Sequence, residues 1–263
     1  RLWPNARFDL RATNDGFTLS IENFNIDDLS PLRGLPLVAL ICPNNRIKSL
    51  EPLKGMPLAT LNCIGNPVTS LEPLAGMPLN TLVIEGCPFE SVEPLRGLPI
   101  TLLNIGGARI RDIDPLRGMP LTFLACWGNR IQSLEPLADM KYLAALYCSA
   151  NEIETLEPLQ DLSVVSMNCS GNRISSLEPL RKMPLGVLHC GNNRIESLEP
   201  LRGLPLKMLS CQANRITDLE PLKDISLASL VCGANRLTRL DPLLDNPPDD
   251  FRYDSDTLPS AEL

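Results

Sequence analysis

The sequence is built from one unit of about 21 residues that recurs along nearly the whole chain of 263 residues. The unit is clearest between Leu188 and Leu209, where the order is L-H-C-G-N-N-R-I-E-S-L-E-P-L-R-G-L-P-L-K-M-L. Its general form is L-x-C-x-x-N-x-I-x-S-L-E-P-L-x-G-M-P-L-x-x. A unit this short cannot bury its apolar side chains alone, so successive units must stack into an elongated solenoid. No other feature of the sequence constrains the fold as strongly.

Three columns of equivalent residues keep this period through eleven units. The first strand position is apolar throughout: Leu19, Leu40, Leu61, Leu82, Leu103, Leu124, Leu146, Met167, Leu188, Leu209 and Leu230. Two residues later comes a mostly cysteine column: Ile21, Cys42, Cys63, Ile84, Ile105, Cys126, Cys148, Cys169, Cys190, Cys211 and Cys232. Three residues further is an asparagine column, Asn45, Asn66, Asn129, Asn151, Asn172, Asn193, Asn214 and Asn235, which Phe24, Cys87 and Ala108 interrupt. The one change of period is a 22-residue unit between Cys126 and Cys148, where Lys141 and Tyr142 replace a proline.

This pattern resembles the leucine-rich-repeat family over roughly residues 18–258, and the phrase N-x-I-x-x-L-x-P-L is most similar to the internalin-type bacterial subclass. The chain departs from the usual pattern by placing cysteine where a core leucine is common and by running one residue short. The resemblance implies an α/β fold, namely a right-handed β/3-10 solenoid. Its concave parallel sheet would have about 11–12 strands, with short 3-10 or single-turn helices on the convex side. It also implies asparagine amides that hydrogen-bond neighbouring loops.

The segment after the asparagine predicts a short capped turn on the convex side. Ser, Thr or Asp, the preferred residues at helix N-caps, occupies one column: Asp28, Ser49, Ser70, Ser91, Asp112, Ser133, Thr155, Ser176, Ser197 and Asp218. An acidic residue two positions later favours the positive end of the helix dipole, and proline is tolerated in a first turn. Glycine and a second proline then end the element, which we therefore expect to be 3-10 or a single helical turn.

The chain divides into three parts by this pattern. Residues 1–17 predict an N-terminal cap, in which a β-hairpin at Asn14-Asp15-Gly16 adds an antiparallel strand to the first repeat, with Trp3 packed nearby. Residues 18–244 hold the eleven-unit solenoid. Residues 245–263 stay in register, with Phe251 and Tyr253 on the leucine and cysteine columns, and predict a degenerate capping repeat and tail. There, Asp256 and Leu258 fall on the asparagine and isoleucine columns.

Bulk composition excludes several classes. A net charge of −7 argues against a nucleic-acid or anionic-membrane binder, and no run of 18 apolar residues predicts a membrane span. The chain opens at Arg1 without a methionine, which favours an excised piece of a longer protein. We expect a monomer that inserts into no membrane.

The nine cysteines favour a buried, reduced row rather than a disulfide framework or a metal site. Their number is odd, and eight stand in one inward strand column, where free cysteine acts as a small hydrophobe. Thiols stacked about 4.8 Å apart in one row cannot surround a tetrahedral zinc ion. We expect no cofactor. A reduced row favours the cytoplasm and leaves the cell surface or secretion open.

Outward strand positions predict the binding surface, because repeat proteins usually bind there. Most are small or aliphatic, and the larger ones form the candidate partner-binding set: Phe123, Trp127, Tyr147, His189, Met208 and Gln212. Clustered aromatic side chains in solvent are typical binding anchors. The alternative is that Phe123 and Tyr142 only fill space at the one-residue insertion.

A second candidate is an arginine edge that follows the asparagine column. Its candidate members are Arg130, Arg173, Arg194, Arg215 and Arg236, and Arg46 and Arg109 stand at the same position. Guanidinium groups bind acidic groups through paired hydrogen bonds. The favoured alternative is a solvated edge whose charge is balanced by the acidic column Glu135, Glu157, Glu178, Glu199 and Glu220.

Catalysis has little support in the sequence. The single histidine, His189, precedes Cys190, and adjacent residues of a strand point to opposite faces, so the pair cannot act together. We expect a non-catalytic recognition module, part of a larger bacterial protein, that binds a protein partner on the concave face. The alternatives are a structural spacer or surface-assembly element, and glycan recognition by stacking on Trp127 and Tyr147.

Overall fold

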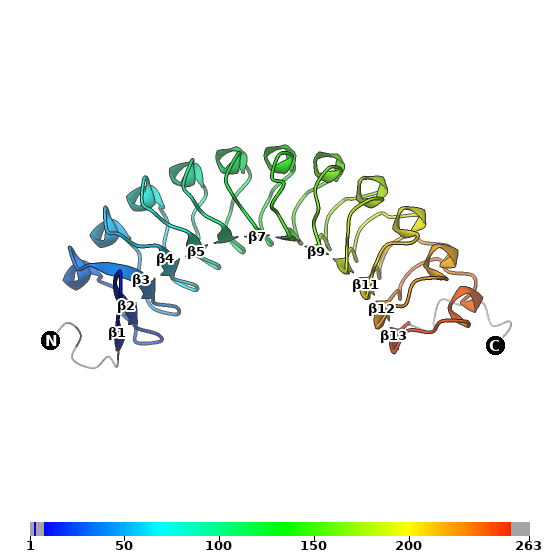
Figure 1. Cartoon of the computed structure of the whole chain (residues 1–263), viewed down its shortest axis with the longest axis horizontal. Helices are drawn as coiled ribbons and strands as arrows, with labels where there is room; N and C mark the ends of the chain where they lie inside the picture. The colour runs from blue at the N-terminus through cyan, green and yellow to red at the C-terminus, as the bar shows by residue number, and fades with distance from the viewer. Residues whose placement is uncertain (1–2, 4–7, 254–263) are drawn as a thin grey trace. The chain divides into compact units, whose positions relative to one another are not determined.

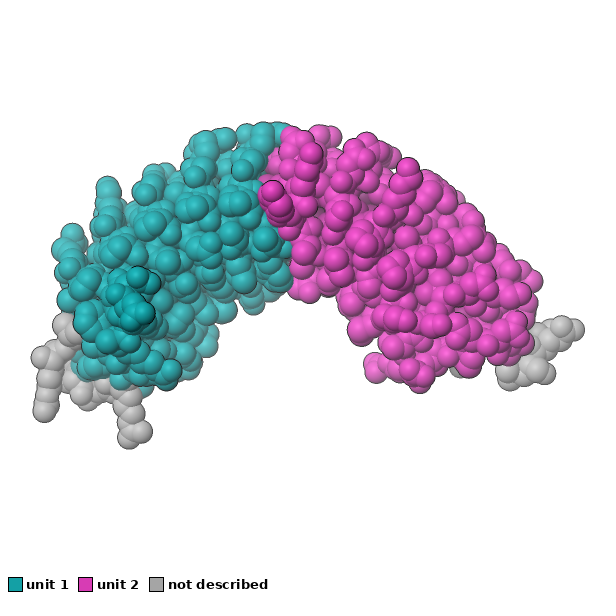
Figure 2. All heavy atoms as spheres, viewed as in Figure 1, with its two compact units in different colours: residues 1–131 teal, residues 132–263 magenta. Residues whose placement is uncertain are grey.

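The computed structural model describes Trp3 and residues 8–253, and the chain forms two compact units, residues 1–131 and residues 132–263 (Figure 2). Both units are stacks of strand–turn repeats. In each, the strands lie along one side of the stack and the 3-10 turns along the other (Figure 1). Every helical element among the described residues is a single 3-10 turn of three residues.

The first unit begins with a hairpin and then alternates turn and strand. Its elements are β1 (Asp9–Thr13), β2 (Gly16–Ser20), η1 (Ser30–Leu32), β3 (Leu37–Ile41), η2 (Glu51–Leu53), β4 (Thr60–Asn62), η3 (Glu72–Leu74), β5 (Thr81–Val83), η4 (Glu93–Leu95), β6 (Leu102–Asn104), η5 (Asp114–Leu116) and β7 (Phe123–Ala125). β1 is antiparallel to β2, and each later strand pairs in parallel with the one before it.

The second unit continues the alternation without a hairpin. Its elements are η6 (Glu135–Leu137), β8 (Ala145–Tyr147), η7 (Glu157–Leu159), β9 (Ser166–Asn168), η8 (Glu178–Leu180), β10 (Val187–His189), η9 (Glu199–Leu201), β11 (Met208–Ser210), η10 (Glu220–Leu222), β12 (Ser229–Val231), η11 (Asp241–Leu243) and β13 (Asp250–Arg252). Its strands pair in parallel in chain order. The predicted leucine-rich-repeat solenoid with 3-10 turns is therefore confirmed.

The strand register places the predicted columns in the core. Leu61 pairs with Leu82, and Leu188 with Leu209, so equivalent residues of successive repeats are neighbours. Each column leucine is at most 4% exposed, while its strand neighbours are mostly part-exposed. Strands of period two thus bury one side chain and present the next to solvent.

The first strand, β1, and the last strand, β13, both carry exposed apolar residues. At the start, Leu10 of β1 pairs with Leu19 and stays 51% exposed. At the other end, Phe251 of β13 pairs with Leu230, is 39% exposed, and stacks on Tyr253 at 6.2 Å between ring centroids. Trp3 Nε1 donates to the Asp28 carbonyl oxygen at 3.3 Å. Asp256 and Leu258 lie outside the described residues.

The serine column caps the turns from one position earlier than the sequence predicts. The residue at the N-cap is the following leucine, Leu50 in η2, which makes no side-chain cap hydrogen bond. The hydroxyl or carboxylate one residue before it accepts the N–H of the first turn residue instead, as Glu51 N donates to Ser49 Oγ at 3.2 Å. The same bond recurs at 2.8–3.2 Å in ten turns. The chemistry of this column was predicted correctly, and its position was wrong by one residue.

The turn after each 3-10 element follows its sequence. After η2, Lys54 has φ −55° and ψ 126° and Gly55 has φ +72°, which is a type II turn that requires glycine. After η8, where Lys182 replaces the glycine, Arg181 instead has φ −52° and ψ −29°, as in a type I turn. One residue thus selects the turn type without changing the repeat.

The asparagine column links successive repeats through both ends of each amide. Asn172 Nδ2 donates to the carbonyl oxygens of Cys148 in the preceding repeat and Cys169 in its own, both at 3.0 Å. Its Oδ1 accepts Ile153 N–H at 3.0 Å. Asn66, Asn129, Asn193, Asn214 and Asn235 repeat this arrangement. The predicted asparagine ladder is confirmed.

The ladder changes at its two interruptions in the first unit. At Cys87 the thiol takes over, with Sγ 3.5 Å from the Cys63 carbonyl oxygen. At Ala108 the side chain has no polar atom, and Phe89 N turns to the Cys87 carbonyl oxygen of its own loop at 3.0 Å.

The nine cysteines are buried and free, as the sequence predicts. Burial raises the pKa of Cys42, Cys126 and Cys169 from 9.0 to about 12. These thiols therefore stay protonated at neutral pH, which removes the thiolate that acts as nucleophile or metal ligand.

Asn193 and its neighbour Asn192 give a matched test of the ladder. Asn193→Ala leaves two carbonyl groups and the Ile174 N–H without their amide partner, so we expect a loss of about 2–4 kcal/mol of unfolding free energy. Asn192→Ala is the control, because Ala213 and Ala234 hold the equivalent position with the same left-handed φ of 53°. Thermal and urea unfolding followed by circular dichroism would measure both. Equal losses would contradict the ladder's role.

The buried thiols predict that stability falls at alkaline pH. Below pH 9 the thiols are protonated in both the folded and the unfolded chain, so their contribution to the free energy of unfolding is fully present. Above pH 9 the unfolded chain loses protons that Cys126 and Cys169 keep until about pH 12, so unfolding becomes easier as pH rises. Each thiol adds up to about 1.4 kcal/mol per pH unit to this slope. Urea unfolding at pH 8–11 should show a shallower slope for Cys169→Ala than for wild type, and equal slopes would contradict the shift.

Candidate functional site: the exposed strand face

The candidate site is the set of outward side chains on the strands, which we call the strand face. Each repeat contributes three positions, namely the residues on either side of the column leucine and the residue after the cysteine column. The five repeats of β8–β12 contribute fifteen such positions. They are Ala145, Tyr147, Ser149, Ser166, Asn168, Ser170, Val187, His189, Gly191, Met208, Ser210, Gln212, Ser229, Val231 and Gly233. None is Asp, Glu, Lys or Arg, although 21% of the chain is. In these five repeats the charged side chains lie instead on the turns and loop edges.

In the first unit the strand face carries an apolar pair that the sequence reasoning missed in part. Leu102 of β6 pairs directly with Phe123 of β7, and both side chains are half-buried. Phe123 was predicted, whereas Leu102 was not singled out. The available signal was its position immediately before a column leucine, equivalent to Phe123 in the next repeat.

Trp127 lies on the backbone of the repeat before it. A Cβ added to Gly106 would stand 2.5 Å from the indole Cε2 and Nε1, and one on Gly107 would stand 3.6 Å from Cη2. The ring is consequently half-buried and held in place by a position where only glycine fits. The signal was the glycine 21 residues before the tryptophan.

Gln212 has the same arrangement in the second unit. Its amide lies over Gly191, where an added Cβ would come within 2.6 Å of Cδ. Ser210 Oγ donates to Gln212 Oε1 at 2.6 Å, which orients the amide on the strand face. At Trp127 and at Gln212, a glycine at the equivalent position of the preceding repeat therefore leaves room for the large side chain to lie flat on the sheet.

The other candidates in the second unit have different degrees of exposure. The Tyr147 hydroxyl is 3.3 Å from Ser166 Oγ on β9, His189 is half-buried on β10, and Met208 on β11 is 41% exposed. Cys190 beside His189 is fully buried, so the two side chains point to opposite faces. Phe123 and Trp127 belong to the first unit and the other four candidates to the second.

The interpretation of the insertion as a space-filling device is wrong for Tyr142. Its side chain is 78% exposed, so it fills no interior volume. The extra residue is accommodated in the turn, where Lys141 N donates to Asp139 O at 2.9 Å and Leu143 N to Met140 O at 2.9 Å.

The arginine edge is partly neutralised, by carboxylates other than those we expected. Arg173 pairs with Glu152 and Glu154 at 3.5 and 3.7 Å. Arg215 pairs with Glu196 at 3.5 Å. In the described part of the chain, no salt bridge involves the three other candidate members, Arg130, Arg194 and Arg236.

The acidic column faces a different set of arginines. Glu178 and Glu199 pair with Arg181 and Arg202, three residues later on the turn side, at 2.7 and 2.8 Å. These hydrogen bonds hold the pKa of Glu178 below its usual value. The expectation that these two carboxylates balance the arginine edge is therefore wrong.

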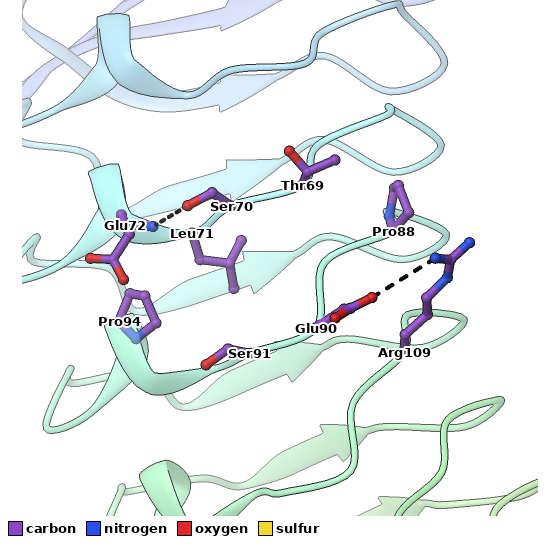
Figure 3. Close-up of a pocket in the computed structure, with 9 residues that line it drawn as sticks. All are labelled: Thr69, Ser70, Leu71, Glu72, Pro88, Glu90, Ser91, Pro94 and Arg109. Atoms are coloured by element: carbon purple, nitrogen blue, oxygen red, sulfur yellow. Dashed lines mark hydrogen bonds and ion pairs between the residues drawn. The ribbon is translucent and has the colours of Figure 1, made fainter.

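A surface hollow lies beside the arginine edge in the first unit (Figure 3). Its volume is about 550 Å³, and Ser70, Glu72, Pro88, Glu90 and Arg109 are among its lining residues. Arg109 and Glu90, which both line it, form an ion pair at 3.9 Å. A neighbouring hollow of about 490 Å³ lies between Glu90, Arg109, Arg111, Asp112 and Arg130. Ser70 Oγ accepts Glu72 N–H and is a capping group rather than a nucleophile.

The described residues offer neither a metal site nor a membrane span. They contain no group of three or more His, Cys, Asp or Glu side chains placed to hold a metal ion. They also contain no helix long and apolar enough to cross a membrane.

Comparison with solved structures places the fold. The internalin InlF of Listeria monocytogenes superposes with a TM-score of 0.75 at 24% identity, over 91% of this chain and 78% of InlF. Internalin C2 from the same organism gives 0.60 at 28% identity over 65% and 79%. The functional domain of InlJ, also from Listeria monocytogenes and including a cysteine ladder, gives 0.62 at 22% identity over 93% and 64%. No family model and no curated protein matches the sequence.

Fold and repeat together define the class. The chain is a leucine-rich-repeat solenoid whose asparagine amides and cysteine column form ladders that are continuous in the second unit and interrupted in the first. Within that class its fold is similar to those of the internalins InlF, internalin C2 and InlJ.

The contact between Trp127 and Gly106 gives a spectroscopic test. We expect Gly106→Ala to displace the indole into water and shift its fluorescence to longer wavelength, since the new Cβ would stand 2.5 Å from the ring. Trp3→Phe as background leaves Trp127 as the one remaining tryptophan. Gly186→Ala is the control, because its nearest neighbour, Val165 O, is 3.9 Å away. An unshifted spectrum in Gly106→Ala would contradict the packing.

Proposed function

We propose that this chain is a non-catalytic bacterial recognition module that binds a protein partner through its strand face. The observation that carries the proposal is the absence of charge from that face over β8–β12. Fifteen consecutive outward positions in β8–β12 are uncharged, whereas the turns and loop edges carry the ion pairs. Charged residues are depleted at the centres of protein interfaces and enriched at their rims, which is the same distribution.

The side chains on this face suit a partner of mixed apolar and neutral polar character. Leu102 with Phe123 and the indole of Trp127 offer apolar area in the first unit. Tyr147 and Gln212 offer oriented polar groups in the second. Rigid aromatic residues lose little conformational entropy on binding and are frequent interface anchors. The similarity to internalins supports an interaction module in general and leaves the partner to experiment.

A comparative capture experiment tests this proposal. Immobilised wild type would be compared with Trp127→Ala/Tyr147→Ala and with Leu102→Glu/Phe123→Glu, after circular dichroism has shown that each variant folds. We expect both strand-face variants to lose a captured partner, with affinity falling at least about 30-fold. The alanine variant loses two aromatic anchors and the glutamate variant buries unpaired charges, and each change costs about 2 kcal/mol or more.

The matched control is Arg194→Gln/Arg236→Gln on the loop edge, which should retain the partner. A partner kept by the strand-face variants and lost by the edge control would move the site to the arginine edge. Capture of nothing by any form would favour the structural spacer.

A further inference from the structure

One cysteine stands outside the cysteine column. Eight of the nine occupy the strand position, whereas Cys87 stands three residues later, where other repeats have asparagine. Its Sγ lies 3.5 Å from the Cys63 carbonyl oxygen and 3.9 Å from the Glu85 carbonyl oxygen. The Asn66 amide contacts the equivalent carbonyls one repeat earlier. The Cys87 thiol thus occupies the place of an asparagine amide.

Cys87 also receives the hydrogen bonds that an asparagine oxygen receives elsewhere. Asn45 Oδ1 accepts the N–H groups 21 and 19 residues before it. The equivalent N–H groups before Cys87 belong to Asn66 and Val68, and both point to its sulfur. A sulfur that accepts two backbone N–H groups has a local environment that stabilises the thiolate.

The nearest thiol to Cys87 is Cys63, in the cysteine column of the preceding repeat. The two side chains hydrogen-bond to each other, and both are fully buried. This bond from Cys63, followed by the two N–H groups, lowers the pKa of Cys87, while the same bond and burial raise the pKa of Cys63. Cys87 is therefore the thiol of the pair that ionises first. By contrast, burial alone raises the pKa of the column thiol Cys126 to about 12.

We propose that Cys63 and Cys87 are a redox pair that closes into a reversible disulfide when the protein meets a peroxide. The Cys87 thiolate attacks a peroxide oxygen, the O–O bond breaks, and water leaves with Cys87 as the sulfenic acid. The Cys63 sulfur then attacks the Cys87 sulfur, the S–O bond breaks, and a second water leaves. The two thiols lose two electrons and two protons in total, and these reduce hydrogen peroxide to two waters.

Access to this buried pair comes from the weakness of the ladder around it. The Cys87 thiol replaces an amide that makes several short hydrogen bonds in other repeats, and Ala108 in the next repeat contributes none. Loops held by fewer hydrogen bonds open locally at lower free energy. The Cys87 loop should thus admit a small oxidant more readily than the loops that Asn129 or Asn172 close.

The disulfide would replace a hydrogen-bonded link between two repeats with a covalent one. It would join residues 24 apart in the sequence, and such a cross-link stabilises a fold mainly by restricting the unfolded chain. The oxidised protein should therefore unfold at a higher temperature than the reduced one, and dithiothreitol should reverse the rise.

Peptide mapping after mild oxidation tests the proposal. The folded protein would be treated with hydrogen peroxide, its remaining thiols alkylated in denaturant, and its peptides analysed by mass spectrometry. We expect one cross-linked product joining the Cys63 and Cys87 peptides, lighter by about 2 Da than the two reduced peptides together. The other cysteines should be alkylated.

Three variants make the result decisive. Cys87→Asn restores the asparagine of other repeats and should fold without forming the cross-link. Cys63→Ala should leave Cys87 as a sulfenic acid that dimedone labels. Cys126→Ala removes a column thiol and should keep the cross-link at the wild-type rate. Absence of the Cys63–Cys87 product in folded wild type, or oxidation spread over the column cysteines, would overturn the proposal.

Discussion

The structure depends on satisfying the backbone groups that the loops leave without a strand partner. From β4 on, each repeat has only a three-residue strand, so most of its N–H and C=O groups must bond elsewhere. The asparagine amide supplies a donor and an acceptor from one side chain. Asn214 donates to the carbonyl oxygens of Cys190 and Cys211 and accepts the Ile195 N–H, all at 3.0 Å. A single residue thereby joins two successive repeats. These bonds fix the distance between repeats, and hence between neighbouring strands of the strand face.

The 3-10 turns follow from the same constraint, namely the small number of residues in each repeat. A serine or acidic side chain accepts the first free N–H, proline occupies the position that needs none, and a 3-10 turn closes in three residues. Because the turns are short and polar, they carry the ion pairs Glu178–Arg181 and Glu199–Arg202. By contrast, charge is absent from the strand face of β8–β12, and the proposed recognition function rests on this difference.

Periodicity predicted the columns well and side-chain neighbours less well. The inward leucine and cysteine columns and the short turns follow from spacing, whereas the asparagine ladder was implied by the resemblance to leucine-rich repeats. Trp127 was predicted as an outward anchor, but its contact with Gly106 was not. The alternative in which Tyr142 fills space at the insertion was wrong. The carboxylates that reach the arginine edge were also assigned to the wrong column. Spacing within one repeat says which way a side chain points and does not say which atoms of the next repeat it meets.

By itself, the sequence determined the period, the buried columns and the chemistry of each turn, because these depend on neighbours within one unit. Only the tertiary structure decided the contacts between units, because these depend on how far one repeat is offset from the next. That offset brings residues 19, 21 and 24 apart together in the ladder. It also puts the Cys87 thiol beside Cys63 rather than beside another asparagine position. The pairing of those two thiols is a property of the stack, and no single repeat contains it.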